Sequence, residues 1–527
     1  MTEARRAVVR IASNYVRLFA TVCLGLYLIR VLLQTIGEEG VGLFALLGST
    51  VGIVSTIEEA AGWSMIRELG TAHHRGDDAE FRRMYNSAVA VSLVAAAIMM
   101  LMFLGLLAIL PWLEISAQLQ SASRVFILAM GVTSAAMVAM SPAFNMYLIT
   151  ERMVTYNAWM ITRRLTMLLA ALSLFVLNPQ HDPGRGLIIY GLGYCVLQIV
   201  AMGLSVAVIA AKDRRLIPAL RCADRAGMKS IIGISGWNVG ILLSQVFVAP
   251  VGQIIMNRSF GLTLGNLTFG LGTQLSGYLR VFASGITTGL DAVSTRMSVT
   301  SDSGSSPMLG LLRTSAQLHA LAAFPCLVGL FVMAEPFLHW WIGARVSDPA
   351  TLSTIATMTR IMAVAFAIMC LSDCWTRVLY GGRFIARLAP VLIASYLATP
   401  IVALLLLATM AESHRLYAVA WAIVATHFVF HILVLPVIVA RAMHIGLWAV
   451  FAPLWRPAVA AAMCAPILVF VVRQVPTWNI GWLVAAPLPY CAAFAAVTWL
   501  FVMNREERAR FRTAFGMLRR RMLSGRA

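Results

Sequence analysis

One long apolar stretch, residues 267–296, carries a row of polar side chains. At about 100° per residue, these side chains fall within an arc of about 80° on a helix. A guanidinium at the middle of a membrane helix costs about 3 kcal/mol or more unless it meets water, protein or a ligand. We therefore expect a polar pathway inside a helical bundle, formed in this stretch by Thr273, Ser276, Arg280, Ser284, Thr287 and Asp291.

Three further apolar segments present polar faces of the same kind. At helical spacing, the first segment aligns Asn14 with Arg17, the second aligns Glu59 with glycine and serine, and the seventh aligns Asn238 with Gln245. Four such faces can enclose one aqueous cavity. Together with Arg360, considered below, we predict substrate contacts from Arg280, Arg17, Asn14, Ser276, Gln245, Asn238 and Arg360.

The arginines indicate the charge of the ligand. A planar guanidinium donates two hydrogen bonds to a phosphate and keeps its charge in a low-dielectric cavity. Arg17 and Arg280 therefore suit an anionic group such as a diphosphate. Arg17 lies near the inner end of its segment, so it can instead reach the inner headgroups. Arg360, in the outer half of the tenth segment, can extend the cationic lining or reach outer headgroups, which we favour.

Four carboxylates lie nearest the membrane interior: Glu58, Glu59, Asp291 and Asp373. A buried carboxylate can bind a proton or help to hold Na⁺, which is how a transporter couples to an ion gradient. All four also lie toward inner segment ends, where helix caps and salt bridges are common, and Asp373 stands one turn before Arg377. A structural role is favoured for each, and Glu59 is the best candidate for coupling to H⁺ or Na⁺.

Composition places these residues in an integral membrane protein. Apolar residues make up 60% of the 527 positions and charged residues 12%, whereas soluble domains have about 45–50% and about 25%. Several nearly uncharged stretches are long enough to cross a bilayer. The eight cysteines show no CxxC pair or Cys/His spacing typical of a metal site. We expect an all-α polytopic fold that contains no metal or other cofactor.

The apolar segments predict about 14 transmembrane helices. Residues 224 positions apart match in pairs such as Asn14 with Asn238 and Gly37 with Gly261, which predicts an internal repeat of two pseudo-symmetric six-helix lobes. The expected organisation follows from this repeat. It has an N-lobe at residues 1–215, a C-lobe at 216–440, an extra helix pair at 441–503 and a basic amphipathic tail at 504–527.

Basic residues set the expected orientation. If both ends lie in the cytoplasm, most of the 41 lysines and arginines fall in inner segments, as the positive-inside rule requires. The formal charge of +19 is concentrated beside the spans, where it attracts anionic lipids rather than nucleic acid. We therefore expect both termini to be cytoplasmic, with anionic lipids as partners of the basic loops and tail.

Enzymatic activity is not expected. No Walker A sequence occurs, and the outer loops are too short for a domain with its own core. A membrane glycosyltransferase would need catalytic acids on sizeable outer loops, but the acidic residues there are scattered and form no motif. We therefore name no catalytic residue.

Short motifs near the N-terminus and after the fourth apolar segment carry a family resemblance. They are Asn14-x-x-Arg17, Leu28-Ile-Arg30, Ile36-Gly37-Glu-Glu-Gly40-Val-Gly42-Leu-Phe44, Arg67-Glu-Leu69 and Tyr147-Leu-Ile-Thr-Glu-Arg152. The chain resembles polysaccharide flippases of the Wzx type, in the multidrug/oligosaccharidyl-lipid/polysaccharide exporter superfamily. It departs from many relatives in having Gln245 and Gln253, rather than an acidic residue, in the seventh segment. That departure leaves the coupling ion open.

The resemblance implies two lobes around a cationic cavity that move by alternating access in the bacterial cytoplasmic (inner) membrane. The implied cargo is an oligosaccharide on polyprenyl diphosphate, passed from the inner to the outer leaflet for cell-surface polysaccharide assembly. Other polysaccharide-assembly membrane proteins are possible partners. Two alternatives share the fold: a flippase of the peptidoglycan lipid precursor and an ion-coupled drug or metabolite antiporter. An antiporter for cations would more naturally have acidic and aromatic groups in its cavity.

Overall fold

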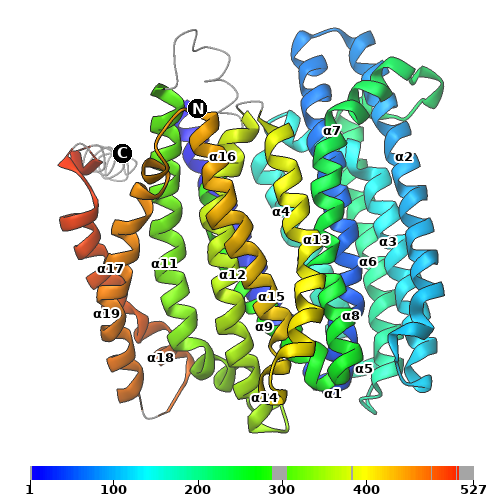
Figure 1. Ribbon diagram of the computed structural model, residues 1–527. Helices are drawn as coiled ribbons and strands as arrows, with labels where there is room; N and C mark the ends of the chain where they lie inside the picture. The colour runs from blue at the N-terminus through cyan, green and yellow to red at the C-terminus, as the bar shows by residue number, and fades with distance from the viewer. Residues whose placement is uncertain (1–2, 288–305, 382–383, 476, 506, 510–527) are drawn as a thin grey trace, which may run out of the picture. The chain divides into compact units, whose positions relative to one another are not determined.

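The computed structural model describes residues 3–287, 306–381, 384–475, 477–505 and 507–509. Every regular element in these ranges is a helix, and none of them is a strand (Figure 1). Hydrocarbon offers no hydrogen-bond partners, so an apolar segment that crosses it must pair its backbone groups internally. A helix does this within a single segment, which is why these apolar runs fold as helices.

Eleven helices in the described part of the chain are long and apolar enough to cross a membrane. They include α2 (Asp78–Ile109), α3 (Ala117–Ile149) and α6 (Pro183–Lys212), each longer than the roughly 20 residues that a bilayer requires. The predicted all-α, polytopic architecture with about 14 helices is confirmed. The chain is a multi-pass membrane protein.

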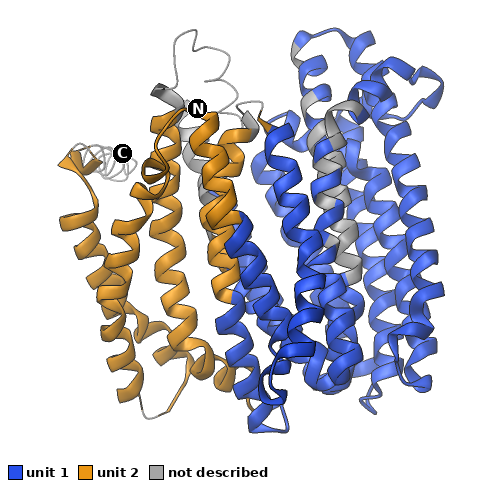
Figure 2. Cartoon of the chain, in the orientation of Figure 1, with its two compact units in different colours: residues 1–278, 344–362, 385–430 blue, residues 279–343, 363–384, 431–527 orange. Residues whose placement is uncertain are grey.

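The chain forms two compact units (Figure 2). Unit 1 comprises Met1–Tyr278, Ala344–Met362 and Ile385–Phe430, and unit 2 comprises Leu279–Gly343, Ala363–Phe384 and His431–Ala527. The chain passes from one unit to the other five times, and three of these passages lie within helices: α9 (Thr268–Thr287), α12 (Pro349–Gly381) and η6 (Phe428–Val434). The predicted lobe boundaries stay a prediction.

Unit 1 contains most of the N-terminal half of the chain. Besides α2, α3 and α6, its elements are α1 (Glu3–Arg75), η1 (Leu110–Leu113), α4 (Met153–Leu172), α5 (Leu174–Leu177), η2 (Arg214–Leu216), η3 (Leu220–Cys222), α7 (Arg225–Ser244), η4 (Gln245–Phe247), α8 (Ala249–Phe260), η5 (Gly261–Leu267), α13 (Ile385–Thr409), α14 (Glu412–Arg415) and α15 (Ala418–His427).

Unit 2 has its own apolar core. Cys464, Leu468 and Tyr490 are buried there, and Val328 and Phe494 pack against them. Tyr490 and Phe494 stack with ring centroids 6.3 Å apart. The elements of this unit are α11 (Ser306–Ile342), α16 (Leu435–Ala442), α17 (Leu447–Gln474), α18 (Ile480–Ala485), α19 (Pro487–Val497) and η7 (Thr498–Val502).

Two glycines break the helices of unit 1 in the same way. Gly37, inside α1, has φ 69° and ψ −175°, and Gly261, which follows α8, has φ 76° and ψ −174°. An L-residue with a side chain rarely adopts this region, whereas glycine adopts it at no steric cost. The two residues also form one of the pairs of the internal repeat, and their backbone conformations are nearly the same.

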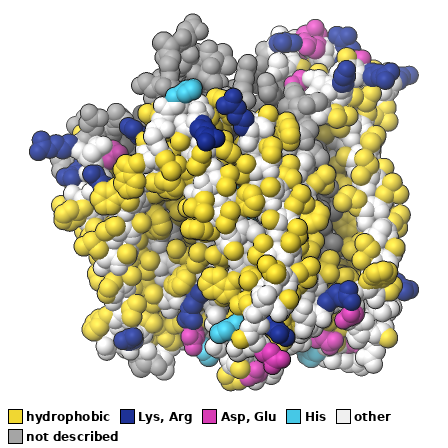
Figure 3. All heavy atoms as spheres, viewed as in Figure 1, with side chains coloured by type: hydrophobic (Ala, Val, Ile, Leu, Met, Phe, Trp, Pro, Cys, Tyr) yellow, Lys and Arg dark blue, Asp and Glu magenta, His cyan; other side chains and the backbone are white. Residues whose placement is uncertain are grey.

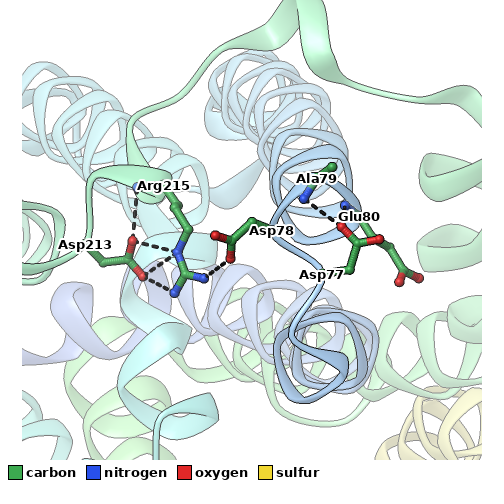
Figure 4. A network of polar contacts seen from close by, with 6 residues as sticks. All are labelled: Asp77, Asp78, Ala79, Glu80, Asp213 and Arg215. Carbon is green, nitrogen blue, oxygen red and sulfur yellow. Dashed lines mark hydrogen bonds and ion pairs between the residues drawn. The ribbon is translucent and has the colours of Figure 1, made fainter.

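A polar network holds the segment between α6 and α7 against the start of α2 (Figure 4). Arg215 donates to Asp213, with Nη2 and Oδ2 2.7 Å apart, and also pairs with Asp78. The hydrogen bonds from Arg215 hold the pKa of Asp213 below its usual value, although partial burial acts in the opposite direction. Asp77 caps α2 by accepting from the backbone N–H of Ala79 and Glu80, which lowers its pKa as well.

Charged side chains gather at the ends of the helices on the face shown in Figure 3, and the helix sides between them are largely hydrophobic. Exposed apolar residues such as Leu101, Val196 and Ile401 lie within helices that could span a membrane. In a soluble protein such a surface would cause aggregation. Acyl chains solvate it in a bilayer, which agrees with the membrane assignment.

Candidate functional site

A cavity of about 440 Å³ lies inside unit 1. Its wall is formed by both arms of α1, on either side of Gly37, together with η4, α8, η5 and α9. Gly270 allows α1 and α9 to approach closely, because a Cβ at this position would lie 2.6 Å from the Cβ of Ala45. Phe44 and Phe269 contribute the aromatic part of the lining.

The polar lining of this cavity is uncharged. Among the described residues that line it, the polar side chains are two hydroxyls and three carboxamides, and none is acidic or basic: Ser49, Thr273, Gln245, Gln253 and Gln274. A carboxamide both donates and accepts hydrogen bonds, and a hydroxyl does the same. The rest of the described lining is apolar or glycine, and these five side chains can exchange neutral hydrogen bonds with a ligand group such as a sugar hydroxyl.

Two lining atoms have no hydrogen-bond partner among the residues that the structure describes. Gln253 is 3% exposed, and its Oε1 atom is buried without a hydrogen bond. The Oγ1 atom of Thr273 is also buried without a partner. Leaving a buried polar atom unsatisfied costs about 1–3 kcal/mol. Both atoms line the cavity, so a molecule that enters it can supply the missing hydrogen bonds.

A second polar feature lies beside the cavity. Gln274, which lines the cavity, donates from Nε2 to the hydroxyl of Tyr278 at 3.0 Å. The hydroxyl lies 2.5 Å from where a Cβ on Gly25 would be, so a larger residue at position 25 would have to displace the tyrosine side chain. Arg164 of α4 is close enough to Tyr278 to act on it electrostatically.

Arg164 is placed where a charge is costly. It lies midway along the span Met153–Leu177 and its side chain is exposed. The hydrogen bond described for its guanidinium is a weak one, from Nη1 to the sulfur of Met167 at 3.6 Å. A charge at this depth marks a functional position more often than a structural one. Arg164 is thus a candidate contact for an anionic ligand next to the cavity.

The structure distributes the predicted contact residues over several places. Gln245 lines the cavity. Asn14 accepts a hydrogen bond from Nδ2 of Asn157 at 2.8 Å, which joins α1 to α4. The Ser276 hydroxyl is buried 2.8 Å from the carbonyl oxygen of Thr359. Asn14 and Ser276 therefore have hydrogen-bond partners within the protein, and their role in substrate binding stays a prediction.

The predicted arginines do not line this cavity. Arg17 is half-buried in α1, and its Nε atom is buried without a hydrogen bond among the described residues. Arg360 is half-buried in the part of α12 that belongs to unit 1, whereas Arg280 is half-buried in α9 within unit 2. Each arginine keeps its predicted role as a proposal, separate from the amide-lined cavity.

Several predicted residues cannot be placed. The side chains of Glu58, Glu59 and Asn238 lie outside the described residues, as does Asp291. Asp373 is half-buried in the part of α12 that belongs to unit 2. Its predicted role in ion coupling is not tested by this position.

Some residues of the site were not singled out from the sequence. Gln274 and Ser49 lie in apolar segments, and nothing in their spacing distinguishes them from residues that pack between helices. Arg164 did carry a signal: with Arg163 it forms a pair of adjacent charges inside an apolar run. The reasoning applied to Arg280 applies equally to that pair.

Comparison with known proteins gives a match in structure alone. No protein-family model matches the chain, and no curated protein matches it. An inward-facing multidrug resistance MATE family transporter of the MOP superfamily is similar, with a TM-score of 0.67 and 10% identity over 83% of this chain and 98% of that one.

Two further structures extend the comparison. The lipid II flippase MurJ, in an inward closed conformation, has a TM-score of 0.65 and 12% identity, covering 93% of this chain and 98% of its own. A variant of the Vibrio cholerae MATE transporter VcmN has a TM-score of 0.59 and 13% identity, covering 84% and 98%. The chain therefore has the fold that MATE transporters share with the MurJ flippase.

Proposed function

We propose that the protein is a flippase that moves a polyprenyl-diphosphate-linked oligosaccharide from the inner to the outer leaflet by alternating access, for cell-surface polysaccharide assembly. The observation that carries the proposal is the uncharged cavity of unit 1. Carboxamides and hydroxyls match the neutral hydroxyls of a sugar. A transporter of cationic drugs would instead gain from carboxylates, and none lies among the described lining residues.

Arginine side chains are suited to the diphosphate of the proposed cargo. A diphosphate needs cationic donors, and the guanidinium forms paired hydrogen bonds to phosphate oxygens. Arg164 lies beside the Gln274–Tyr278 pair, and Arg17 presents a buried Nε without a partner among the described residues. A cargo with neutral sugars and an anionic linkage would use both the cavity and these arginines.

The proposed activity lowers the free-energy barrier to moving polar groups across the membrane, and it involves no chemical reaction. Sugars and a diphosphate cannot cross about 30 Å of hydrocarbon unaided, because each desolvated polar group is costly. A polar cavity replaces part of the lost hydration while the lipid tail stays in the bilayer. No bond is made or broken, so the proposal requires no catalytic residue and no cofactor.

The setting of this activity is proposed together with it. We place the protein in the bacterial cytoplasmic membrane with both termini inside, where its basic loops and tail meet anionic lipids. A gradient of H⁺ or Na⁺ would drive the cycle. Other membrane proteins of polysaccharide assembly would deliver and remove the cargo.

Flipping of the peptidoglycan lipid precursor is the second candidate function. The specific observation in its favour is the extent of the structural match. The MurJ flippase matches 93% of this chain, whereas the MATE transporters above match 83% and 84% of it. Both cargoes combine sugars with a lipid diphosphate, so the same cavity and arginines would serve either one.

Deletion of the gene followed by analysis of lipid-linked glycans tests the proposal. We expect surface polysaccharide to be lost and its lipid-linked unit to accumulate in the inner leaflet. The wild-type gene should restore export, Arg164→Ala should not, and Arg164→Lys, which keeps the charge, should restore it in part. Accumulation of the peptidoglycan precursor would select the second candidate. Unchanged glycans together with altered drug tolerance would instead contradict both flippase functions.

A further inference from the structure

A buried histidine in unit 2 has an unused ring nitrogen. His319 of α11 is 1% exposed and lies inside the span Leu309–Ile342. Its Nδ1 atom is 2.8 Å from the carbonyl oxygen of Ser315. A carbonyl only accepts hydrogen bonds, so Nδ1 carries the hydrogen and Nε2 of the neutral ring holds a free lone pair. This Nε2 atom is buried and has no hydrogen-bond partner among the described residues.

The charged groups around His319 come from the neighbouring helix of the same unit. Asp373 and Arg377 of α12 are the charged side chains found to act on the ring electrostatically. Asp373 is half-buried, and Arg280 of α9 acts together with it on Cys370, one turn earlier in α12. The ring thus lies near the carboxylate of Asp373, which favours a positive charge on it, and near the guanidinium of Arg377, which disfavours that charge.

A second buried histidine contacts the same part of α12. His431 is 3% exposed, and its Nδ1 atom lies 2.8 Å from the hydroxyl of Ser372, the residue before Asp373. His431 belongs to η6, a short π-helix. Such segments are rare and frequently occur at functional sites. The parts of α11, α12 and η6 that belong to unit 2 therefore bring titratable or polar side chains to residues 372–377.

Two ordinary explanations for His319 do not account for this arrangement. A histidine that serves only packing normally has both ring nitrogens satisfied, because an unsatisfied buried acceptor costs about 1–3 kcal/mol. A metal site would need further ligands, but no group of three His, Cys, Asp or Glu suited to a metal occurs in the described part of the chain. A lone pair that accepts a proton during the working cycle fits the observed geometry.

We propose that Nε2 of His319 is a proton-binding site, and that its protonation shifts the conformational equilibrium of the transporter. A proton taken from water on one side adds to the lone pair and forms an imidazolium, which Asp373 stabilises and Arg377 opposes. Any movement of α12 relative to α11 changes this balance and therefore the affinity for the proton. By linkage, the proton favours the conformation that binds it better.

This inference differs from the predicted coupling through carboxylates, because the proton binds to a histidine and Asp373 only stabilises the resulting charge. It does not depend on the cargo, since the site lies in unit 2 and the cavity of the proposed function lies in unit 1. Histidine is the side chain whose unperturbed pKa puts its change of charge between about pH 5 and 8, which makes this residue type suited to binding a proton under physiological conditions.

The first test observes the ring directly. The full chain, labelled with ¹⁵N-histidine and reconstituted in vesicles of phosphatidylethanolamine and phosphatidylglycerol, is titrated by solid-state NMR. His319→Asn keeps a donor for Ser315 but cannot titrate, so it identifies the His319 signals among nine histidines. We expect these signals to change with pH, and Asp373→Asn and Arg377→Gln to move their midpoint in opposite directions. A ring that stays neutral from about pH 4.5 to 8.5 overturns the proposal.

The second test links the proton to conformation. Spin labels at Gln180→Cys and Thr477→Cys, exposed loop positions of the two units, are measured by electron–electron resonance after replacement of the eight native cysteines. We expect the distance distribution to differ between about pH 5 and pH 8, and this difference to disappear in His319→Asn and in His319→Gln. The coupling is contradicted if the distances in the wild-type protein do not change with pH. It is also contradicted if both variants show the same change with pH as the wild-type protein.

Discussion

Substitution of Gln253 by leucine should make the protein more stable and less active. The Oε1 atom of Gln253 is buried without a hydrogen-bond partner in the described part of the chain, and recovery of its desolvation is worth about 1–3 kcal/mol. Leucine has a similar volume, and a change of shape in a packed interior usually costs less than about 1.5 kcal/mol. The net expectation is a gain of about 1 kcal/mol in the free energy of unfolding, measured by thermal unfolding in detergent.

The same substitution removes a hydrogen-bonding group from the cavity. A neutral hydrogen bond to a ligand contributes about 1 kcal/mol, which corresponds to roughly five-fold in affinity. We therefore expect export of the glycan, measured by complementation of the deletion strain, to fall several-fold at low expression. Binding sites commonly carry such local instability because their polar groups await a ligand.

Gln198 provides a matched control in the same unit. It is 1% exposed and therefore buried, as Gln253 is, but its Oε1 accepts a hydrogen bond from the Thr166 hydroxyl at 2.6 Å. Gln198→Leu removes a satisfied contact, so we expect it to lose about 1 kcal/mol of stability. If Gln253→Leu is destabilised to the same extent, Oε1 has a structural partner after all. If it is stabilised but exports glycan normally, the cavity does not bind the cargo.

Three further predictions concern the framework around the site. Gly42→Ala should destabilise the fold by about 1–3 kcal/mol in thermal unfolding, because its Cβ would overlap the carbonyl oxygen of Leu262. Arg215→Gln should lower stability by about 1 kcal/mol near pH 7, since the pair with Asp213 is partly exposed. The lowered pKa of Asp213 stabilises the fold above the ordinary value of about 4, and this contribution is lost as pH falls through the lowered value. Ser276→Ala should cost about 1 kcal/mol of stability and leave export unchanged if the hydroxyl only packs against α12.

Each of these predictions has a control and a contrary outcome. Gly70→Ala, also in α1, adds a Cβ with no atom within 4 Å and should be tolerated, so equal damage at both glycines would exclude the steric explanation. The deficit of Arg215→Gln should shrink as pH falls below about 4, and a deficit independent of pH would exclude the ion pair. Loss of export without loss of stability in Ser276→Ala would restore this residue to the transport pathway.

Much of the helical architecture could be predicted from local properties of the chain. An apolar run of about 20 residues must form a helix in a membrane whatever its neighbours are, because the requirement for internal hydrogen bonds acts on each segment alone. The positions of Gly37 and Gly261 were likewise informative, since a backbone region with positive φ favours glycine. These features do not depend on how the helices pack together.

The candidate site could be predicted only in part. Periodicity places Thr273 and Ser276 on one face of α9, yet Thr273 lines the cavity while Ser276 packs against Thr359. The glycine break at Gly261 and the π-helix η5 set the rotation of α9 relative to α8. A spacing of 100° per residue cannot be continued across such a break. Helical periodicity therefore could not predict that Gln253 and Thr273 line the same cavity.

The sequence by itself determined a membrane protein of long helices, with arginines and amides inside apolar segments where isolation would be costly. Tertiary structure decided which of these groups meet. It placed Gln253 without a partner at a cavity, Arg164 beside Tyr278, and His319 near Asp373. The reason is that hydrophobicity and length are properties of one segment, whereas hydrogen-bond satisfaction depends on the rotation and register of several helices at once.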